Sequence, residues 1–313
     1  TDNRLGFFMW AIRVRKLLKK MYAAGEIECV NFHFPPMLAG IFLPKEIPLI
    51  LTVHSTYLGM AGKVTNSSHF KLDINPISLW MKVFLEKILL KKSQQVITLN
   101  EKGVSELKYY GYTNPIRTIP NGVDINLFEP SFDHFKEFDV IFCGRIEQMK
   151  GSRPMVEICK ALISFRPNIN ICIVGYGEDQ EYVNSELSGF SQIQLIGKVP
   201  FEKVSTFYSK SKIYASSSYY EGLPGTCLEA MAMGLPAVGW ALPFYTGLVS
   251  SGENGYLEEV NDIQKFCDSI NSLLDDEIKR TKFGHSARLH IEKYYDWKIL
   301  ARKMVNAFEK VSL

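Results

Sequence analysis

The sequence predicts an α/β protein with two domains, each built on a parallel sheet, and three observations support this prediction. The 313 residues suffice for two domains of ordinary size, and 46% of them are hydrophobic. Short apolar runs rich in β-branched residues alternate with longer segments of helical periodicity, as in βα units whose sheets are buried on both faces. The net charge also differs between the two parts of the chain, with +7 in residues 1–128 and −4 in residues 129–313. Either the two parts have different tasks, or the surface charge simply drifts.

The expected strands follow the apolar runs. In the first half they span residues 27–34, 48–54, 95–99 and 116–119, and in the second half 139–143, 169–174, 193–196, 213–216 and 236–239. Helices are expected at 154–165, 201–209, 226–233 and, with an amphipathic pattern, at 296–313. The charge changes sign near residues 128–130, and the loop-like stretch 131–138 that follows is expected to link the two domains.

Several classes of protein are excluded by the composition. No run of about 18 apolar residues occurs, so no transmembrane helix is predicted. The first 20 residues lack the order of a signal peptide, because apolar residues precede the charges. The six cysteines show neither a CxxC motif nor metal-ligand spacing, which indicates buried thiols in a reducing compartment. We therefore expect a cytoplasmic protein without a zinc module, a disulfide scaffold or a nucleic-acid partner.

The loop after strand 139–143 has the composition of a phosphate site. It runs from Gly144 and Arg145 to Lys150 and Gly151, and a helix follows. In open parallel sheets, ligands bind beyond the carboxyl ends of the strands. Arginine offers a two-pronged donor, lysine a point charge, and the helix dipole adds to both. The pattern suits a polyanion such as a diphosphate, although a surface loop with two solvated cations fits equally well.

A second glycine turn follows strand 169–174, at Gly175-Tyr176-Gly177-Glu178. It resembles the start of a GxGxxG dinucleotide fingerprint, but Gln180 stands where the last glycine is required. This mismatch counts against an NAD-dependent dehydrogenase. A tight turn that lets a nucleotide approach the backbone remains open.

Two carboxylates flank a glycine-rich turn after strand 213–216. Glu221 lies in the loop, and Glu229 lies in the first turns of the next helix, with Gly-Leu-Pro-Gly between them. Backbone N–H groups at such a helix start favour phosphate or sugar oxygens, and carboxylates accept hydrogen bonds from polyol hydroxyls. The alternative for Glu229 is a carboxylate that stabilises the helix dipole.

These three blocks, in this order and approximate spacing, resemble the retaining family-4 glycosyltransferases of GT-B fold. The most specific is Glu221-x7-Glu229 within EGLPGTCLEAMAMGLPAV. Further upstream, Leu51-Thr52-Val53-His54 resembles the histidine strand of that family's first domain, and 119–124 resembles its hinge. The resemblance runs from about residue 27 to the end of the chain.

The resemblance implies two Rossmann-like domains facing a cleft. Residues 1–128 with 297–313 would form the acceptor-side domain, and residues 129–296 the domain that binds the nucleotide-sugar donor. Only 26 residues precede strand 27–34, and they contain no glycine pair. The first domain is therefore expected to lack about one βαβ unit, either through truncation at the N-terminus or because it is reduced.

The family's roles carry over residue by residue. Arg145 and Lys150 would hold the donor diphosphate and stabilise charge on the leaving nucleotide. Glu229 would bind the ribose and Glu221 the donor sugar. His54 would lie across the cleft near the transferred sugar, although an ordinary histidine at a strand end is the alternative. The full donor-binding set is Gly144, Gly175, Gly177, Lys198, Val199, Gly222, Leu223, Pro224, Gly225, Thr226, Cys227 and Glu229.

The implied activity is a hexosyltransferase that moves a sugar from a UDP- or GDP-sugar to a hydroxyl of a glycan, a polyprenyl-linked sugar or another glycolipid. The chain has no Asp-x-Asp motif, so Arg145 and Lys150, without a metal or other cofactor, are expected to neutralise the diphosphate. The alternatives are a GT-B epimerase or phosphorylase and a non-catalytic subunit of a transferase complex.

The first 21 residues show apolar side chains at helical spacing, with Arg13, Lys16 and Lys20 on other faces. Such a basic amphipathic helix either lies on an anionic membrane or packs its apolar stripe against the first domain, and packing is favoured. Together with the charge of +7, the pattern raises the hypothesis of peripheral association with the inner face of the cell membrane.

Overall fold

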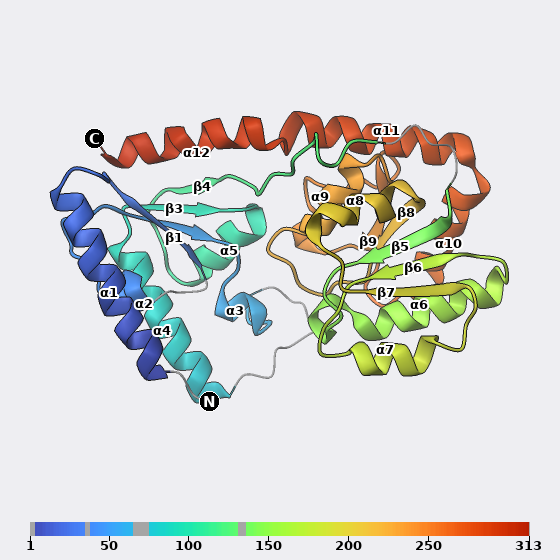
Figure 1. Cartoon of the computed structure of the whole chain (residues 1–313), viewed down its shortest axis with the longest axis horizontal. Coiled ribbons are helices and arrows are strands. Elements are labelled where there is room, and N and C mark those ends of the chain that lie inside the picture. The colour runs from blue at the N-terminus through green and yellow to red at the C-terminus, as the bar shows by residue number, and fades with distance from the viewer. Residues whose placement is uncertain (1–3, 35–37, 65–74, 131–135, 313) are drawn as a thin grey trace. The chain divides into compact units, whose positions relative to one another are not determined.

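The structure, a computed structural model, describes residues 4–34, 38–64, 75–130 and 136–312 (Figure 1). It divides into two compact units, one formed by residues 1–120 and 300–313 and the other by residues 121–299. The division falls after Pro120, earlier than the expected position after Phe128. The reason is that Phe128 is buried in the second unit, where its ring packs edge-on against Phe201 with the centroids 5.6 Å apart.

Unit 1 contains a four-stranded parallel sheet in the order β1-β2-β3-β4. The strands are β1 (Val30–Phe34), β2 (Leu49–Val53), β3 (Gln95–Thr98) and β4 (Ile116–Thr118). Its helices are α1 (Arg4–Ala23), α2 (Leu38–Ile41), α3 (Tyr57–Met60), α4 (Pro76–Lys92), α5 (Glu101–Tyr109) and most of α12 (Trp297–Ser312). All four strands expected in the first half are present, and β1 begins three residues later than expected.

Two apolar clusters cover the two faces of this sheet. Along β2, Leu49 and Leu51 belong to one cluster and Ile50 to the other, as the alternation of side chains in a strand requires. Helix α1 adds Leu18 to the first cluster. Helix α12 covers the second face through Leu300. Part of the apolar face of α1 is therefore packed inside unit 1.

Unit 2 contains a six-stranded parallel sheet in the order β10-β9-β8-β5-β6-β7. The strands are β5 (Phe138–Cys143), β6 (Ile171–Val174), β7 (Ile193–Gly197), β8 (Ser211–Ser216), β9 (Ala237–Trp240) and β10 (Gly255–Glu258). Strand β10 was missing from the sequence prediction because its short Gly-Tyr-Leu-Glu segment has no β-branched residue. It forms the sheet edge beside β9, with Gly255 opposite Ala237.

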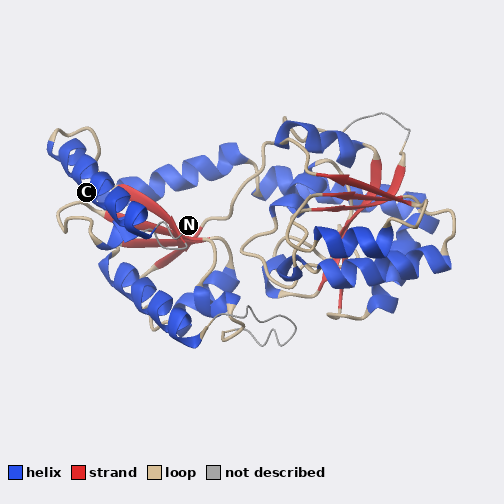
Figure 2. Cartoon of the chain, turned by 60° about the horizontal axis from the view of Figure 1, so that its bottom comes forward, coloured by secondary structure: helices blue, strands red, loops and turns tan. Residues whose placement is uncertain are grey.

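Helices cover both faces of the larger sheet. They are α6 (Ser152–Phe165), α7 (Gln180–Leu187), α8 (Phe201–Ser209), α9 (Gly225–Ala232), α10 (Ile263–Asp275) and α11 (Glu277–Tyr294), with short 3₁₀ turns η1 (Gln148–Lys150) and η2 (Pro243–Tyr245). Residues of α8, α9 and α11 share one buried cluster, and residues of α6, α7 and α10 share the other. Figure 2 shows the strands of each unit in red between helices in blue.

The strand order places a topological switch point between β5 and β8. The chain runs from β5 outward through β6 to β7, and then returns to β8 on the other side of β5. The loops that leave β5 and β8 therefore turn in opposite directions and leave a crevice at the carboxyl ends of these strands. Ligands bind at such points in open parallel sheets.

All six cysteines are free thiols. Cys159, Cys172, Cys227 and Cys267 are buried, and Cys29 and Cys143 are half-buried. Within the described ranges, no helix combines the length and the hydrophobicity that crossing a lipid bilayer requires.

The α12 helix is expected to contribute to the stability of unit 1 mainly through Leu300, which is 1% exposed and clusters with Ile50 and Ile97. Leu300→Ala should lower the free energy of unfolding by about 2–4 kcal/mol, because it leaves a cavity in that cluster. Chemical denaturation measures the loss. Val305→Ala on the same helix, where Val305 is 51% exposed, is the matched control and should change stability by less than about 0.5 kcal/mol. Equal losses in the two variants would contradict the assignment.

Candidate functional site

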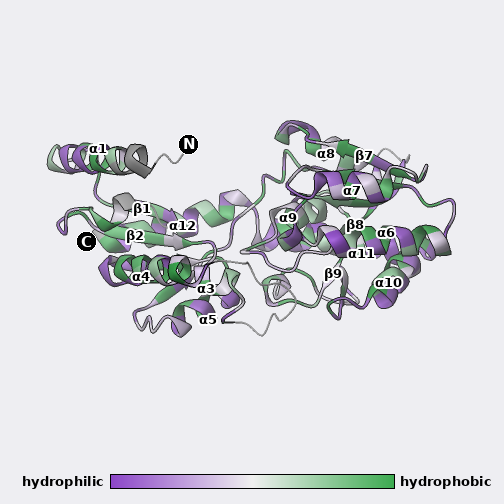
Figure 3. Ribbon diagram, turned by 90° about the horizontal axis from the view of Figure 1, so that it is seen from below, coloured by the Kyte–Doolittle hydropathy of each residue, from purple (hydrophilic) through white to green (hydrophobic). Residues whose placement is uncertain are grey.

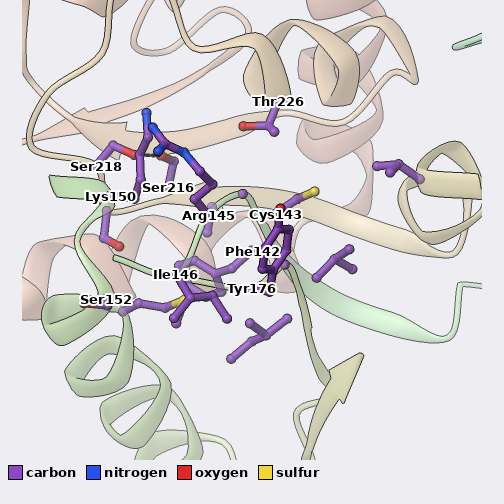
Figure 4. A pocket seen from close by; sticks show the side chains of 18 of the residues that line it. Phe142, Cys143, Arg145, Ile146, Lys150, Ser152, Tyr176, Ser216, Ser218 and Thr226 are labelled. Atoms are coloured by element: carbon purple, nitrogen blue, oxygen red, sulfur yellow. Dashed lines mark hydrogen bonds between the residues drawn. The ribbon is translucent and has the colours of Figure 1, made fainter. Parts of the chain in front are cut away.

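A pocket of about 420 Å³ lies in unit 2 at the carboxyl ends of β5, β6 and β8, at the switch point of the sheet (Figure 4). The residues predicted from the sequence that line it are Gly144, Arg145, Lys150, Gly175, Lys198, Val199, Glu221, Gly225, Thr226 and Glu229. The fold thus brings together segments that are as much as 85 positions apart in the sequence, from Gly144 to Glu229.

The other predicted residues lie outside the lining of this pocket. They are Gly177, Gly222, Leu223, Pro224 and Cys227, together with His54 in unit 1. The Cys227 side chain is fully buried in the core beneath α9.

The glycine turn after β6 is required by the packing of two loops. Gly175 has a φ of +145°, and a Cβ atom there would lie 1.7 Å from the carbonyl oxygen of Gly144. A Cβ atom on Gly177 would lie 2.3 Å from the carbonyl oxygen of Ile146. The N–H of Ile146 donates to the carbonyl oxygen of Tyr176 at 2.9 Å, which holds the loops together. The glycine pattern predicts that something approaches the backbone closely at this turn. In the structure the loop after β5 makes such an approach to Gly175 and Gly177.

A similar contact joins the loop after β5 to the loop after β8. Gly151 has a φ of +72°, and a Cβ atom there would lie 1.9 Å from the carbonyl oxygen of Ser217. The Ser217 hydroxyl donates to the carbonyl oxygen of Gly151 at 2.8 Å, and Trp240 Nε1 donates to the carbonyl oxygen of Ser217 at 3.0 Å. Lys150, immediately before this junction, is thereby held beside the residues that follow β8.

Two of the three cations that line the pocket, Lys150 and Arg145, are paired with carboxylates, and the third is Lys198. Lys150 Nζ lies 2.5 Å from Glu221 Oε2, and both side chains are largely buried. Arg145 Nη1 lies 3.1 Å from Glu147 Oε2, and the arginine side chain is 60% exposed. An ammonium group has three donors, so Lys150 can hold Glu221 and an anionic oxygen at the same time. Arg145 has a guanidinium group with five N–H donors, so it can contact an anionic oxygen as well as Glu147.

Glu229 is half-buried in α9 and lines the pocket. Tyr208 Oη donates to Glu229 Oε2 at 3.0 Å, and it also lies 3.2 Å from the carbonyl oxygen of Thr226. Burial raises the pKa of Glu229 to about 7, although the hydrogen bond from Tyr208 acts in the opposite direction. The carboxyl group is therefore close to its midpoint of ionisation near neutral pH. Tyr208 was missed in the sequence because it occupies an ordinary apolar position of α8.

Two further features of the pocket were missed from the sequence. Ser216 ends β8, Ser217 and Ser218 follow it, and all three are buried and line the pocket. The sequence shows them as three consecutive serines at the end of a predicted strand. Tyr176, inside the glycine turn, also lines the pocket, and Lys198 Nζ lies 4.8 Å above its ring. A half-exposed aromatic ring of this kind offers a surface for stacking a nucleobase.

Two helices begin at the pocket. Ser152 at the start of α6 lines it, and its hydroxyl donates to the Asp179 carboxylate. Gly225 and Thr226, the first residues of α9, also line it, and among the described residues no side chain caps this helix. The amide groups and dipole at such helix starts favour an anion. Cations, helix starts and carboxylates in one pocket suit a phosphorylated compound that also carries hydroxyl groups.

His54 lies in unit 1, directly after β2, beside a buried polar cluster. The N–H of Thr56 donates to Glu106 Oε2 at 3.2 Å, and the N–H of Tyr57 donates to Glu86 Oε1 at 3.0 Å. Burial raises the pKa of Glu86 to about 8. These two buried carboxyl groups therefore hold the turn that follows His54.

Comparison with known proteins identifies the family. The family model of glycosyl transferases group 1 matches residues 126–290, and the model of glycosyltransferase family 4 matches residues 2–127. A phosphatidyl-myo-inositol mannosyltransferase of Mycolicibacterium smegmatis is 24% identical over 311 residues, covering 94% of this chain and 74% of that protein. The chain spans 64%, 55% and 59% of the lengths of three other curated relatives that it matches.

Solved structures agree in fold. Sucrose-phosphate synthase from Thermosynechococcus elongatus matches with a TM-score of 0.79 at 19% identity, over 98% of this chain and 79% of that one. HepE of Anabaena, in complex with UDP and glucose, matches with a TM-score of 0.76 at 16% identity, over 94% of this chain and 81% of that one. The two parallel-sheet units thus have the GT-B fold that the sequence predicts. The chain belongs to the glycosyl transferases group 1 family, with an amino-terminal region of glycosyltransferase family 4.

Proposed function

We propose that this chain transfers a hexose-type sugar from a nucleoside diphosphate sugar to a hydroxyl group of a glycan or of a lipid-linked acceptor. The main support for the proposal is the pocket at the switch point of unit 2, which is lined by three cations and two carboxylates. Cations suit a diphosphate, and carboxylates suit the hydroxyls of a ribose and a hexose. UDP- and GDP-sugars both offer this combination of groups.

The names of related proteins support the donor and acceptor classes. The Mycolicibacterium relative is named as a phosphatidyl-myo-inositol mannosyltransferase, and phosphatidyl-myo-inositol is a lipid. The HepE structure contains UDP and glucose. A donor with a uracil or guanine base and an acceptor linked to a lipid or glycan are therefore the first candidates for this chain.

The cations and the carboxylates of the pocket would contact different parts of the donor. Arg145 and Lys150 would contact the diphosphate and balance the negative charge that grows on it as the bond from the sugar C1 to the phosphate oxygen breaks. Glu221, held by Lys150, would accept a hydrogen bond from the donor sugar, so that one contact links the leaving group to the transferred group. Glu229 would accept hydrogen bonds from the ribose.

Two further properties belong to the proposal. Transfer would retain the anomeric configuration, as in the family that the sequence resembles. It would also proceed without a divalent metal, because Arg145 and Lys150 place two positive charges at the diphosphate site.

The direct test is a panel of UDP- and GDP-hexoses with glycan and lipid-linked acceptors, with and without EDTA. We expect release of nucleoside diphosphate that depends on the acceptor and is unaffected by EDTA. Epimerised donor or free hexose phosphate would instead support the epimerase or phosphorylase alternative. A chain that binds no nucleotide at all would support the non-catalytic subunit. Either result would overturn the proposal.

Removing the Lys150 charge tests the leaving-group contact. Lys150→Met keeps most of the side-chain volume, leaves Glu221 without its partner and should lower kcat by about 10²–10³-fold. Steady-state kinetics measure the loss. Lys160→Met is the matched control, because Lys160 pairs with Glu186 elsewhere in unit 2 and should leave kcat within about twofold. Wild-type kinetics for Lys150→Met would refute the site.

The raised pKa of Glu229 predicts how nucleotide affinity depends on pH. The ionised carboxylate is the stronger acceptor for ribose hydroxyls, so binding favours the deprotonated form. Affinity for UDP or GDP should therefore fall as the pH is lowered through about 7, the value to which burial raises this pKa. Isothermal titration at pH 6 and pH 8 checks the expectation.

Glu229→Gln provides the control, because it keeps the shape of the side chain and cannot titrate. It should bind about tenfold more weakly at pH 8 and lose most of the pH dependence. An unchanged pH dependence in this variant would show that another group is responsible.

We also propose that unit 1 contacts an anionic membrane surface through α4. Ile77, Trp80, Met81 and Phe84 form an exposed stripe at helical spacing, in which the Trp80 and Phe84 rings stack with centroids 5.8 Å apart. Figure 3 shows hydrophobic residues in green along this helix, between hydrophilic residues in purple. Exposed Lys87 and Lys91 continue the same face. Aromatic side chains beside lysines suit the headgroup region of an acidic bilayer.

Co-sedimentation with vesicles tests this surface. The chain should bind phosphatidylglycerol vesicles at low salt and release at high salt, and it should not bind phosphatidylcholine vesicles. The double change Trp80→Ser with Phe84→Ser should weaken binding at least tenfold, because two aromatic side chains no longer enter the interface. Phe165→Ser on α6, where Phe165 is 66% exposed in unit 2, is the control and should bind like the wild type. Binding that is unchanged by salt and by the Trp80→Ser and Phe84→Ser changes would contradict the proposal.

A further inference from the structure

Four polar side chains share one face of the unit 1 sheet, along β1 and at the end of β2. Asn31 and His33 lie two positions apart on β1, and Thr52 lies on β2 with His54 two positions later. Side chains two positions apart in a strand point to the same face. The register places His33 opposite Thr52, so the four residues form neighbouring pairs across the two strands.

These side chains are joined into one hydrogen-bonded chain. Thr52 Oγ1 donates to Asn31 Oδ1 at 3.0 Å. Asn31 Nδ2 lies 3.3 Å from His33 Nε2. His33 Nδ1 lies 2.8 Å from His54 Nε2, and the two rings are stacked with their centroids 5.1 Å apart. This series of hydrogen bonds begins at the buried Thr52 and ends at His54, the histidine for which the sequence predicts a role in transfer.

Counting hydrogens along this chain determines which nitrogen of each histidine carries a proton. The oxygen of Asn31 accepts from Thr52, so its amide NH₂ group faces His33 Nε2, which must then be an acceptor. A neutral imidazole has one N–H and one acceptor nitrogen. His33 consequently carries its hydrogen on Nδ1 and donates it to His54 Nε2, and His54 keeps its own hydrogen on Nδ1.

We propose that Asn31 and His33 are positioning residues that hold His54 as the neutral Nδ1–H tautomer. Nε2 of His54 is occupied by His33, and the Nδ1–H group is the donor that remains for a substrate oxygen. His54 thus acts as a hydrogen-bond donor through Nδ1 and not as a base through Nε2. The effect on sugar transfer rests on the proposed function, whereas the tautomer itself does not.

The surroundings of His54 agree with a neutral ring. Burial, followed by the neighbouring His33, lowers the pKa of His54. A proton added to His54 Nε2 would remove the acceptor of the 2.8 Å hydrogen bond from His33. The hydrogen bond therefore favours an unprotonated Nε2 on His54.

Nitrogen-15 NMR of the intact labelled chain at neutral pH measures the tautomers directly. We expect a protonated Nδ1 and an unprotonated Nε2 on both His33 and His54, with assignments from His33→Gln and His54→Gln spectra. If the oxygen and nitrogen of the Asn31 amide are exchanged, the donor and acceptor of every hydrogen bond in the series are exchanged too. His54 then carries its hydrogen on Nε2. A wild-type spectrum with Nε2–H on His54 would therefore overturn the proposal.

Asn31→Asp tests the coupling, because it replaces the amide donor by a second acceptor oxygen of nearly the same shape. Thr52 can still donate to one carboxylate oxygen, and His33 Nε2 must gain a hydrogen to bond to the other. We expect this new Nε2–H signal on His33. Asn114→Asp makes the same charge change at an exposed position of unit 1 and should leave both histidine spectra unaltered. No change at His33 in Asn31→Asp would contradict the coupling.

Kinetics give a second and separate result. Asn31→Asp should lower kcat for sugar transfer at least about tenfold and leave the affinity for UDP or GDP within twofold, because the nucleotide pocket lies in unit 2. A wild-type kcat in this variant would contradict a positioning role. If neither chain transfers any sugar, the proposed function fails, and the NMR result still decides the tautomer.

Discussion

The candidate site depends on one steric constraint, which is the close backbone contact between the loops that leave β5, β6 and β8. Gly175 and Gly151 make these contacts possible, since a Cβ atom at either position would lie within 2 Å of a neighbouring carbonyl oxygen. The contacts fix the path of the loop that contains Arg145 and Lys150. Without these contacts Arg145 and Lys150 would belong to a long surface loop, and they would not be held at the pocket. The strand order produces the crevice between the loops after β5 and β8. Gly151 and Gly175 determine which side chains of these loops line it.

Electrostatics in the pocket follow from this geometry. The loop contact places Lys150 against Glu221, so a largely buried cation has a carboxylate partner before any ligand arrives. Arg145 stays on the exposed side with Glu147, where it can move toward a phosphate at little cost. Glu229 lies deeper with Tyr208, and its desolvation keeps it near its midpoint of ionisation. The pocket thus combines an exposed arginine, a largely buried lysine and two carboxylates, which suits a ligand that has a phosphate region and a hydroxyl region.

Much of this arrangement could be predicted from the sequence, for identifiable reasons. The βα alternation and the loops around Arg145, Lys150 and Glu229 follow local patterns of hydrophobicity and turn residues. Tyr208 could not be predicted to contact Glu229, because their contact depends on how α8 packs beside α9. The same holds for the His33 and His54 pair, which needs the register between β1 and β2. Strand β10 was not predicted, because its residues have a weak strand propensity and it forms through pairing with β9 at the sheet edge.

The central claim is that the pocket of unit 2 holds a nucleoside diphosphate between the loop after β5 and the start of α9. Amide hydrogen exchange of the whole chain, followed by mass spectrometry with and without saturating UDP or GDP, tests it most directly. Protection is predicted in peptides that cover residues 144–151 and 225–229, because residues of both segments line the pocket. Ligand-dependent protection confined to other segments, or no protection with either nucleotide, would contradict the account.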